Sequence, residues 1–148
     1  MDKISILVPT YLRNKFLPLL LRNIKIQDYP HELLTVIIQD DSPDDKQLIP
    51  DKELQNVKDY LFPINLQYQH LKIKKHIGEK RNSLIKSSPD KVVVFMDDDD
   101  IYISTYISYS YKMLKEKKVK CVGSNKMLFC MSEDEYKVYY IDCGEKID

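Results

Sequence analysis

Short apolar runs that end abruptly in polar residues alternate with helix-like segments along the first two thirds of the chain. Ile4–Val8, Leu33–Ile38 and Val92–Met96 are apolar and too short for helices, so each is interpreted as a buried strand. Leu66–Leu71 alternates between apolar and polar residues, which is typical of a further strand. This alternation predicts an α/β domain with a mostly parallel central sheet flanked by helices.

Helix-like spacing fills the gaps between these runs, and strand-like segments dominate the end of the chain. Expected helices cover the stretch from Asn14 to the Asp28-Tyr29-Pro30 break, Asp45–Tyr60 with a break at Pro50, Gly78–Ser87, and Tyr102–Lys118. Expected strands then cover Val119–Val122, Lys126–Met131 and Tyr136–Ile141. We therefore expect antiparallel strands toward the C-terminus.

Glycine is scarce, which excludes two common phosphate-binding motifs. The 148 residues contain only three glycines, too few for a GxGxxG fingerprint or a P-loop. Any bound phosphate would then depend on a metal ion or on basic side chains. The 23 basic and 23 acidic residues balance, which argues against a general nucleic-acid-binding protein.

The length and the cysteine content predict one domain in a reducing compartment. A chain of 148 residues fits a single domain over residues 1–148. Its three cysteines include no CxxC pair, so neither a disulfide framework nor a zinc site is indicated. The N-terminus lacks the pattern of a signal peptide, and no apolar run reaches the roughly 20 residues of a transmembrane helix. We expect a cytoplasmic protein, soluble or peripheral at a membrane.

Three polar clusters directly follow predicted strands. They are Pro9-Thr10-Tyr11, Asp40-Asp41-Ser42 and the run from Asp97 to Asp100. Open α/β sheets bind ligands beyond the carboxyl ends of their strands. Parallel strands would bring the three clusters to one edge, where we expect the functional site.

The four consecutive aspartates are the most conspicuous of these clusters. Adjacent carboxylates resist full ionisation unless a cation lies among them, and their hard oxygens suit Mg²⁺ or Mn²⁺. If strand geometry continued through the run, Asp97 and Asp99 would point to one face and Asp98 and Asp100 to the other. The alternative is a solvated turn that caps a helix starting near Tyr102.

The other two clusters, together with a basic segment, suggest a nucleotide site, although each has a simpler interpretation. A carboxylate such as Asp41 could accept the imide N–H of uracil, but its neighbours are also strong turn formers. Thr10 and Tyr11 offer a hydroxyl and an aromatic face to a base. Lys80 and Arg81 could reach phosphates from a helix start, or could lie on an exposed helix face.

The order and spacing of five motifs resembles that of the family 2 glycosyltransferases. The motifs are Pro9-Thr10-Tyr11-Leu12-Arg13, Gln27-Asp28-Tyr29-Pro30, Asp40-Asp41-Ser42-Pro43, Gly78 to Asn82, and Asp97 to Asp100. Each motif is weak, but five in the right order are specific, and together they cover about residues 3 to 110. The resemblance implies the GT-A fold. One departure is Ser42, where the family usually has glycine.

The resemblance also implies roles for individual residues. Pro9, Thr10, Tyr11 and Arg13 would line the nucleotide-sugar site, and Asp41 would hold the base, uracil in the commonest donors. Lys80 and Arg81 would lie near the nucleotide, and Asp97 or Asp98 would approach the ribose and the metal. Asp99, with Asp97, would bind the divalent ion, Mn²⁺ or Mg²⁺.

The implied activity is metal-dependent, inverting transfer of a sugar from a nucleotide-sugar donor, most simply a UDP-sugar. The acceptor would be a hydroxyl of a glycan, a lipid-linked molecule or a protein. The family's catalytic base lies well downstream of the aspartate run, and the carboxylates available there are Glu133, Asp134, Glu135 and Asp142. None lies in a recognised motif, so the base stays unassigned.

Two alternatives to this enzyme remain. The chain could be a non-catalytic or truncated nucleotide-sugar-binding module of a larger protein, since its sequence shows recognisable motifs only for binding the donor. A nucleotidyltransferase would also combine an α/β sheet with metal-binding carboxylates. It would usually have a glycine-rich basic loop near the N-terminus, and Pro9 to Arg13 contains no glycine.

Overall fold

The computed structural model describes residues 1–130 and 137–144 and divides the chain into two compact units. The first unit spans Met1–Ser108 and the second spans Tyr109–Asp148. All three polar clusters lie in the first unit. Within the described residues, no helix is long and apolar enough to cross a membrane.

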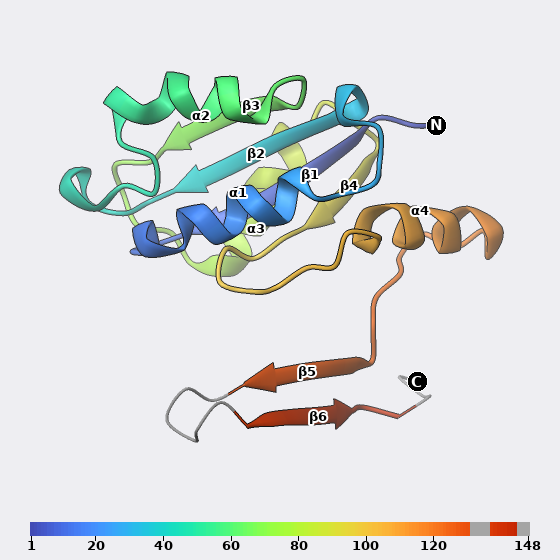
Figure 1. Ribbon diagram of the computed structural model, residues 1–148. Coiled ribbons are helices and arrows are strands. Elements are labelled where there is room, and N and C mark those ends of the chain that lie inside the picture. The colour runs from blue at the N-terminus through green and yellow to red at the C-terminus, as the bar shows by residue number, and fades with distance from the viewer. Residues whose placement is uncertain (131–136, 145–148) are drawn as a thin grey trace. The chain divides into compact units, whose positions relative to one another are not determined.

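A four-stranded parallel sheet forms the centre of the first unit (Figure 1). Its strands are β1 (Ile4–Thr10), β2 (Leu34–Asp40), β3 (Asn65–His70) and β4 (Val92–Phe95). They lie in the order β3-β2-β1-β4, and every pairing is parallel. The predicted parallel sheet is therefore confirmed. Strands β1 and β2 continue further than expected, since Pro9 pairs with Gln39 and Thr10 with Asp40.

Helices flank this sheet and complete its core (Figure 1). They are α1 (Leu17–Lys25), α2 (Leu54–Leu61) and α3 (Ile77–Ser87). Every residue of β1 is buried, as expected for a central strand covered on both faces. Helix α3 packs on β1 and β2, where Leu84 joins Leu7 and Ile37 in the core. This packing brings the N-terminal end of α3 toward the carboxyl ends of the strands.

The segment before α2 differs from the predicted helix over Asp45–Tyr60. Only Leu54–Leu61 is α-helical, and short 3₁₀ turns occupy Asp44–Lys46 and Asp51–Glu53. The helix is shorter than predicted because the Asp40 carboxylate, at the end of β2, accepts the backbone N–H of Leu48 at 2.6 Å. That bond holds the chain in a loop, and Pro50 prevents a continuous helix.

Asp40 organises the loop that follows β2. Its fully buried carboxylate accepts three hydrogen bonds, from the Ser42 N–H at 2.9 Å, the Leu48 N–H at 2.6 Å and the Tyr68 hydroxyl at 2.6 Å. Burial, and then the bond to Asp40, raise the pKa of Tyr68. Because Asp41 and Ser42 follow directly, this bonding fixes one wall of the candidate site.

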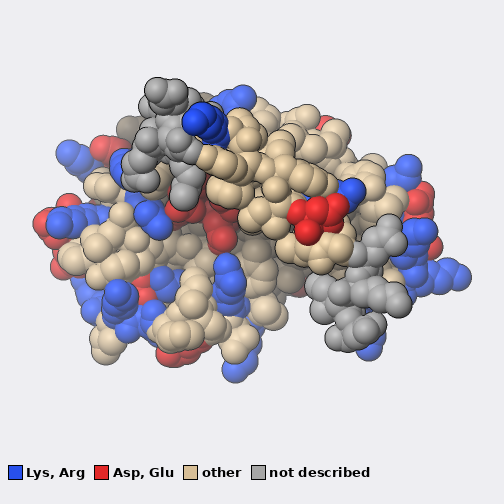
Figure 2. Space-filling view, turned by 90° about the horizontal axis from the view of Figure 1, so that it is seen from below, with Lys and Arg blue, Asp and Glu red and all other residues tan. Residues whose placement is uncertain are grey.

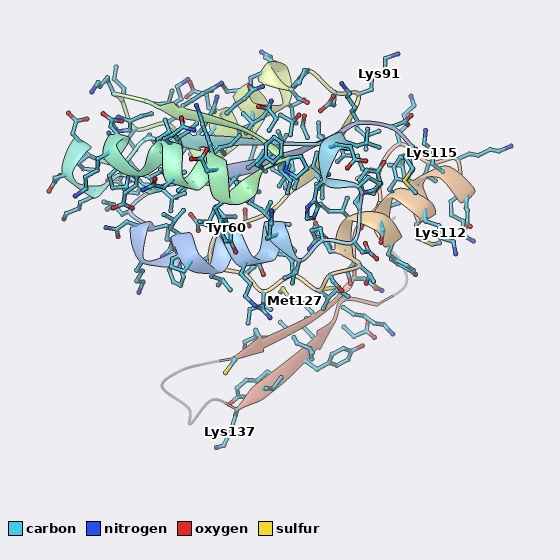
Figure 3. All side chains as sticks on the ribbon, turned by 45° about the horizontal axis from the view of Figure 1, so that its top comes forward. Tyr60, Lys91, Lys112, Lys115, Met127 and Lys137 are labelled. Carbon is cyan, nitrogen blue, oxygen red and sulfur yellow. The ribbon has the colours of Figure 1, made fainter. Side chains whose placement is uncertain are left out.

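Replacing Tyr68 with Phe is expected to lower the free energy of unfolding by about 1.5–3 kcal/mol, since it removes a hydrogen bond to a charged group. The variant also leaves the Ile49 N–H, which donates to the Tyr68 oxygen at 3.3 Å, without its acceptor. Urea unfolding measures the change. The matched control is Tyr60→Phe at an exposed tyrosine (Figure 3), expected within about 0.5 kcal/mol of wild type. Equal stability of the two variants would contradict the role of Asp40.

The second unit contains the end of α4 (Tyr106–Glu116) and a hairpin of β5 (Lys126–Cys130) and β6 (Val138–Asp142). The hairpin is antiparallel, and Phe129 stacks on Tyr139 across it, with ring centroids 5.2 Å apart. The predicted antiparallel strands near the C-terminus are thus confirmed. The predicted strand over Val119–Val122 is wrong, because those residues are irregular and pair with no described strand.

Candidate functional site

The carboxyl ends of β1, β2 and β4 meet at one edge of the sheet, as the sequence predicted. Three long-range contacts demonstrate this. The Lys80 Nζ donates to the Thr10 carbonyl at 2.8 Å, the Ser42 Oγ accepts from the Leu12 N–H at 2.7 Å, and the Arg13 Nη2 lies 3.2 Å from the Asp99 Oδ2. The three polar clusters and the start of α3 therefore form one site.

A strained turn follows β1 and directs Arg13 toward the aspartates. Leu12 has φ of 57°, the left-handed region that non-glycine residues rarely adopt. The Ser42 hydroxyl holds this turn by accepting the Leu12 N–H. Ser42, noted in the sequence as a departure from the family motif, thus joins the loops after β1 and β2. Strain of this kind is common where a site must be pre-organised.

Asp41 and Lys80 form a buried ion pair beneath the site. Their side chains are 0% and 4% exposed, and the Lys80 Nζ donates to the Asp41 Oδ1. The other carboxylate oxygen, Oδ2, accepts the Lys75 N–H at 2.7 Å. Both oxygens of Asp41 are thus engaged by protein groups. Lys80, predicted to lie near the nucleotide, has its charge facing inward, so its direct effect is to hold Asp41 and the end of β1 together.

The four aspartates lie in a turn, so the expectation from strand alternation is wrong. Strand β4 ends at Phe95, and the chain bends at Asp98–Asp100. As a result Asp98 is buried while Asp99 and Asp100 are exposed. The turn therefore buries the Asp98 carboxylate and leaves its neighbours nearer the surface, in place of the predicted alternation between two faces.

Two arginine side chains partly offset the negative charge of this acidic turn. Arg13 lies 3.2 Å from the Asp99 carboxylate and 4.0 Å from the Asp98 Oδ1. Arg81 lies 3.5 Å from the Asp97 Oδ2 and also covers the Phe95 ring. The arginines predicted to contact a nucleotide are therefore placed beside the carboxylates predicted to bind a metal. Acidic and basic groups are likewise interspersed over the face shown in Figure 2.

Buried oxygens without partners make the turn a fitting place for a hard cation. Burial raises the pKa of Asp98, as do the charges of Asp99 and Asp97, while the Thr10 hydroxyl and Arg13 oppose the shift. The Thr10 Oγ1 and Asp98 Oδ2 are buried and have no hydrogen bond of normal geometry among the described residues. Oxygen donors of this kind match Mn²⁺ or Mg²⁺. No three acidic, His or Cys side chains of the described chain already converge as a metal cage.

Asn23 of α1 and Gln27, just after that helix, hold the acidic turn and the segment that follows it. Gln27 belongs to a motif noted in the sequence, whereas sequence reasoning did not identify Asn23. The Asn23 amide donates to the Asp100 carbonyl at 2.7 Å and accepts the Tyr102 N–H at 3.2 Å. Likewise, the Gln27 amide donates to the Ile103 carbonyl and accepts the Ile107 N–H. A signal for Asn23 was present in the sequence, because it is a polar position on the helix face that also buries Leu20 and Ile24.

Tyr11 lies at the rim of the site with a lysine over its ring. The Lys74 Nζ is 3.9 Å from the ring centroid, a cation–π contact. Lys74 comes from the loop between β3 and α3, which also contains Lys72 and Lys75. The aromatic face predicted to receive a base is therefore covered by the Lys74 side chain.

The catalytic base is not located by the structure. Glu133, Asp134 and Glu135 lie outside the described residues. Asp142 is on β6 in the second unit, where its carboxylate accepts the Gly144 N–H at 2.9 Å and the Tyr140 hydroxyl at 3.2 Å. Those bonds give Asp142 a structural role in the hairpin.

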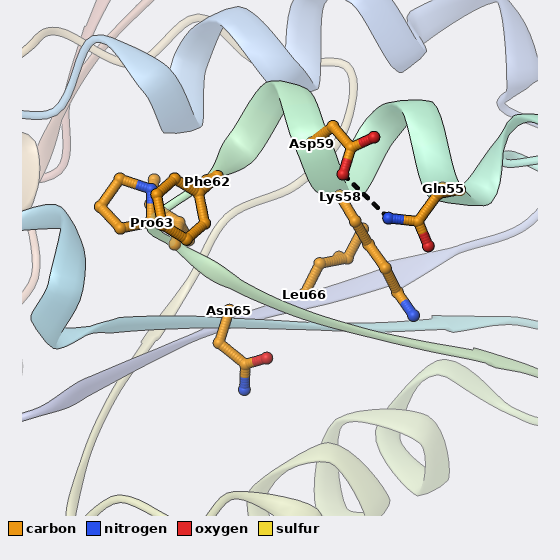
Figure 4. A pocket seen from close by; sticks show the side chains of 8 residues that line it. Gln55, Lys58, Asp59, Phe62, Pro63, Asn65 and Leu66 are labelled. Carbon is orange, nitrogen blue, oxygen red and sulfur yellow. Dashed lines mark hydrogen bonds between the residues drawn. The ribbon is translucent and has the colours of Figure 1, made fainter.

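A separate open hollow of about 630 Å³ lies where β3 begins, at the opposite edge of the sheet from the aspartates (Figure 4). It is lined by residues of α2 and the start of β3, and a bond between the Gln55 and Asp59 side chains crosses its wall at 2.8 Å. None of the predicted site residues lines it, so we do not assign it to the functional site.

Comparison with known proteins identifies the family. Residues 5–145 match the model of "Glycosyl transferase family 2". The chain belongs to glycosyl transferase family 2. Within this family it is similar to the poly(ribitol-phosphate) beta-N-acetylglucosaminyltransferase TarS of Staphylococcus aureus, with 33% identity over 101 residues, 68% of this chain and 17% of TarS. It is also similar to the GalNAc(5)-diNAcBac-PP-undecaprenol beta-1,3-glucosyltransferase of Campylobacter jejuni, with 29% identity over 91% of this chain and 40% of that protein.

Solved structures of similar glycosyltransferases have the same GT-A fold. Residues 1–349 of S. aureus TarS in complex with UDP match with a TM-score of 0.64 and 26% identity, covering 84% of this chain and 38% of that one. The mannosyltransferase PcManGT of Pyrobaculum calidifontis, solved with GDP-Man and Mn²⁺, matches with a TM-score of 0.68 and 21% identity, covering 83% of this chain and 36% of that one. The chain thus spans well under half the length of these relatives.

Proposed function

We propose that this chain binds a nucleotide-sugar, most simply a UDP-sugar, together with Mn²⁺ or Mg²⁺, for inverting transfer of the sugar to an acceptor hydroxyl. The observation that supports this most directly is the meeting of Asp41, the acidic turn and two arginines at the carboxyl edge of a parallel sheet. A UDP complex is known for the similar TarS structure. The acceptor hydroxyl would belong to a glycan, a lipid-linked molecule or a protein.

The base and ribose would lie against the loops after β1 and β2. Tyr11 provides an aromatic face once Lys74 moves aside, and Pro9 and Thr10 end the strand beneath it. Asp41 would accept the imide N–H of uracil once its carboxylate, which the protein covers completely here, is uncovered, since a carboxylate has about four lone-pair sites. Lys80 would act by orienting Asp41 rather than by touching the nucleotide.

The diphosphate and the metal would share the acidic turn. Asp99, with Asp97, would hold the divalent ion, and the buried Asp98 adds an oxygen that lacks a partner. Arg13 and Arg81 would donate to phosphate oxygens, a role that their half-exposed guanidinium groups beside this turn support. When bound, the metal supplies Lewis-acid stabilisation of the negative charge on the leaving diphosphate.

In this reaction the bond between the anomeric carbon and the phosphate oxygen breaks while the acceptor oxygen bonds to the opposite face of that carbon. The acceptor proton passes to a carboxylate base, which we leave unassigned. Arg13 and Arg81 would stabilise the departing diphosphate, since charge that develops there meets fixed guanidinium donors.

A thermal-shift panel of nucleotide-sugars, with and without Mn²⁺, tests the donor assignment. A cognate donor at about 100 times its Kd adds about 2.7 kcal/mol, which raises Tm by about 5–10 °C for a chain of this size. We expect this rise with a UDP-sugar and Mn²⁺ together, and a much smaller rise with either alone. The proposal fails if no nucleotide-sugar shifts Tm in the presence of Mn²⁺.

A nucleotide-sugar-binding module without activity of its own is the second candidate. It is favoured by the coverage of only 17% of TarS and by the unassigned base. A coupled assay that detects UDP released by this chain distinguishes the two candidates. Donor-dependent Tm shifts without UDP release, for acceptors of each class, would identify the binding module.

A further inference from the structure

Arg13 is the basic side chain nearest the part of the acidic turn that would receive a metal. Its guanidinium reaches two carboxylates, with Nη2 at 3.2 Å from the Asp99 Oδ2 and Nε at 4.0 Å from the Asp98 Oδ1. Among the described residues, no other side chain forms an ion pair with Asp98 or Asp99. Arg13 thus supplies to these two carboxylates the positive charge that a metal ion would bring.

The acidic turn needs such a counter-ion. Four successive carboxylates repel one another, and Asp98 is held in a buried position where water cannot screen its charge. Arg13 approaches only the Oδ1 of Asp98, at 4.0 Å, and the buried Oδ2 has no hydrogen bond of normal geometry, so the charge of Asp98 is only partly compensated. This leaves unused oxygen donors that a small divalent ion can engage and a guanidinium cannot.

We propose that Arg13 is an exchangeable counter-cation: a divalent ion displaces it from Asp98 and Asp99, and it then pairs with the diphosphate of the donor. The inference rests on the proposed function and adds to it a coupling between the two ligands. Arg13 changes partners, so metal and donor bind cooperatively.

The coupling follows from the charges. A metal ion that binds alone must separate Arg13 from Asp99 and leave a guanidinium facing a divalent cation. A diphosphate that binds alone must draw Arg13 away and leave carboxylates uncompensated beside another anion. When both ligands bind, each charged group exchanges one partner for another. Each ligand therefore raises the affinity of the other by the same factor.

The backbone around Arg13 allows the side chain to move without the loop. The preceding Leu12 is fixed by its N–H bond to the Ser42 Oγ, while the Arg13 side chain is 46% exposed. By contrast, Lys80 is buried between Asp41 and the Thr10 carbonyl and has no such freedom. Arg81 is also exposed, but its contact with Asp97 is longer, at 3.5 Å.

Mn²⁺ binding, measured by electron paramagnetic resonance of the free ion with and without UDP, tests the exchange. Without UDP, Arg13→Gln is expected to bind Mn²⁺ about three- to tenfold more tightly than wild type, because a competing cation is gone. The factor by which UDP strengthens Mn²⁺ binding is expected to fall by a similar amount. Arg13→Lys, which retains the charge, should keep most of the coupling. Arg22→Gln, at an exposed arginine of α1, should match wild type.

The outcomes separate this inference from the proposed function. Unchanged Mn²⁺ affinity in Arg13→Gln, with UDP still strengthening Mn²⁺ binding as in wild type, would overturn the exchange and leave the metal-dependent donor site standing. Weaker Mn²⁺ binding without UDP would also overturn it, because Arg13 would then support the metal rather than compete with it. If UDP fails to strengthen Mn²⁺ binding in wild type, the metal dependence and the exchange fail together.

Discussion

Replacing Lys80 with Met is expected to lower the free energy of unfolding by about 3–5 kcal/mol, the usual cost of leaving one partner of a buried ion pair alone. Methionine fills a similar volume, so the loss reflects charge. Asp41 would remain fully buried with no ammonium beside it, and the Thr10 carbonyl would lose its donor. Urea unfolding followed by circular dichroism measures the change.

The matched control for this variant is Lys86→Met, at an exposed lysine of the same helix. It is expected to change stability by less than about 1 kcal/mol, since it removes only a favourable charge near a helix C-terminus. The double variant Lys80→Met/Asp41→Asn should recover part of the loss, because the buried charge is then removed with its partner. A Lys80→Met variant as stable as Lys86→Met would show that the pair is not buried in solution.

Replacing Asp99 with Ala is expected to abolish the Mn²⁺-dependent part of donor binding and to reduce any donor turnover at least about a hundredfold, since the metal contributes several kcal/mol to the transition state. The fold should survive, because Asp99 is exposed in a surface turn. Isothermal titration of UDP with and without Mn²⁺ gives the binding change, and released UDP gives the turnover.

Asp100→Ala is the matched control in the same turn. The Asp100 backbone carbonyl, which accepts from Asn23, is unaffected by the substitution, and its carboxylate has only a long contact of 3.5 Å with the Tyr102 hydroxyl. This variant should keep Mn²⁺-dependent binding of UDP. Loss of that binding in Asp100→Ala, with its retention in Asp99→Ala, would reverse the assignment of metal ligand and supporting residue.

The sheet and the location of the site were predictable because both depend on local patterns. Short apolar runs such as Ile4–Val8 are typical of buried strands. The abrupt change from apolar to polar residues marks where each strand ends. Parallel pairing then places Thr10, Asp41 and Asp97 at one edge without further information.

The shape of the acidic turn was not predictable in the same way. The expectation of alternation assumed that the backbone of β4 continues through the aspartates. Instead Asn23 holds the chain in a turn from a distant position, and the nearby Tyr102 hydroxyl accepts the Asp97 N–H. Such bonds between side chains and a remote backbone leave no periodic trace in the sequence.

The other departures also depend on residues outside the segment concerned. The segment after β2 contains helix-compatible residues, yet the Asp40 carboxylate holds it as a loop through Leu48. Val119–Val122 has strand-like residues, but a strand needs a neighbour, and propensity alone does not provide one. The pairing of Arg13 with Asp98 and Asp99 belongs to the same class of long-range contact.

The central position of β1 has a consequence for how the protein is made. On one side β1 pairs with β2, which follows soon in the chain, but on the other side Ile4 pairs with Val92, near the far end of the first unit. During synthesis the sheet therefore exposes an apolar strand edge until β4 leaves the ribosome, and exposed edges of this kind promote aggregation. A nascent chain that stalls before Val92 would be a substrate for chaperones, and the acidic turn would be the last part of the site to form.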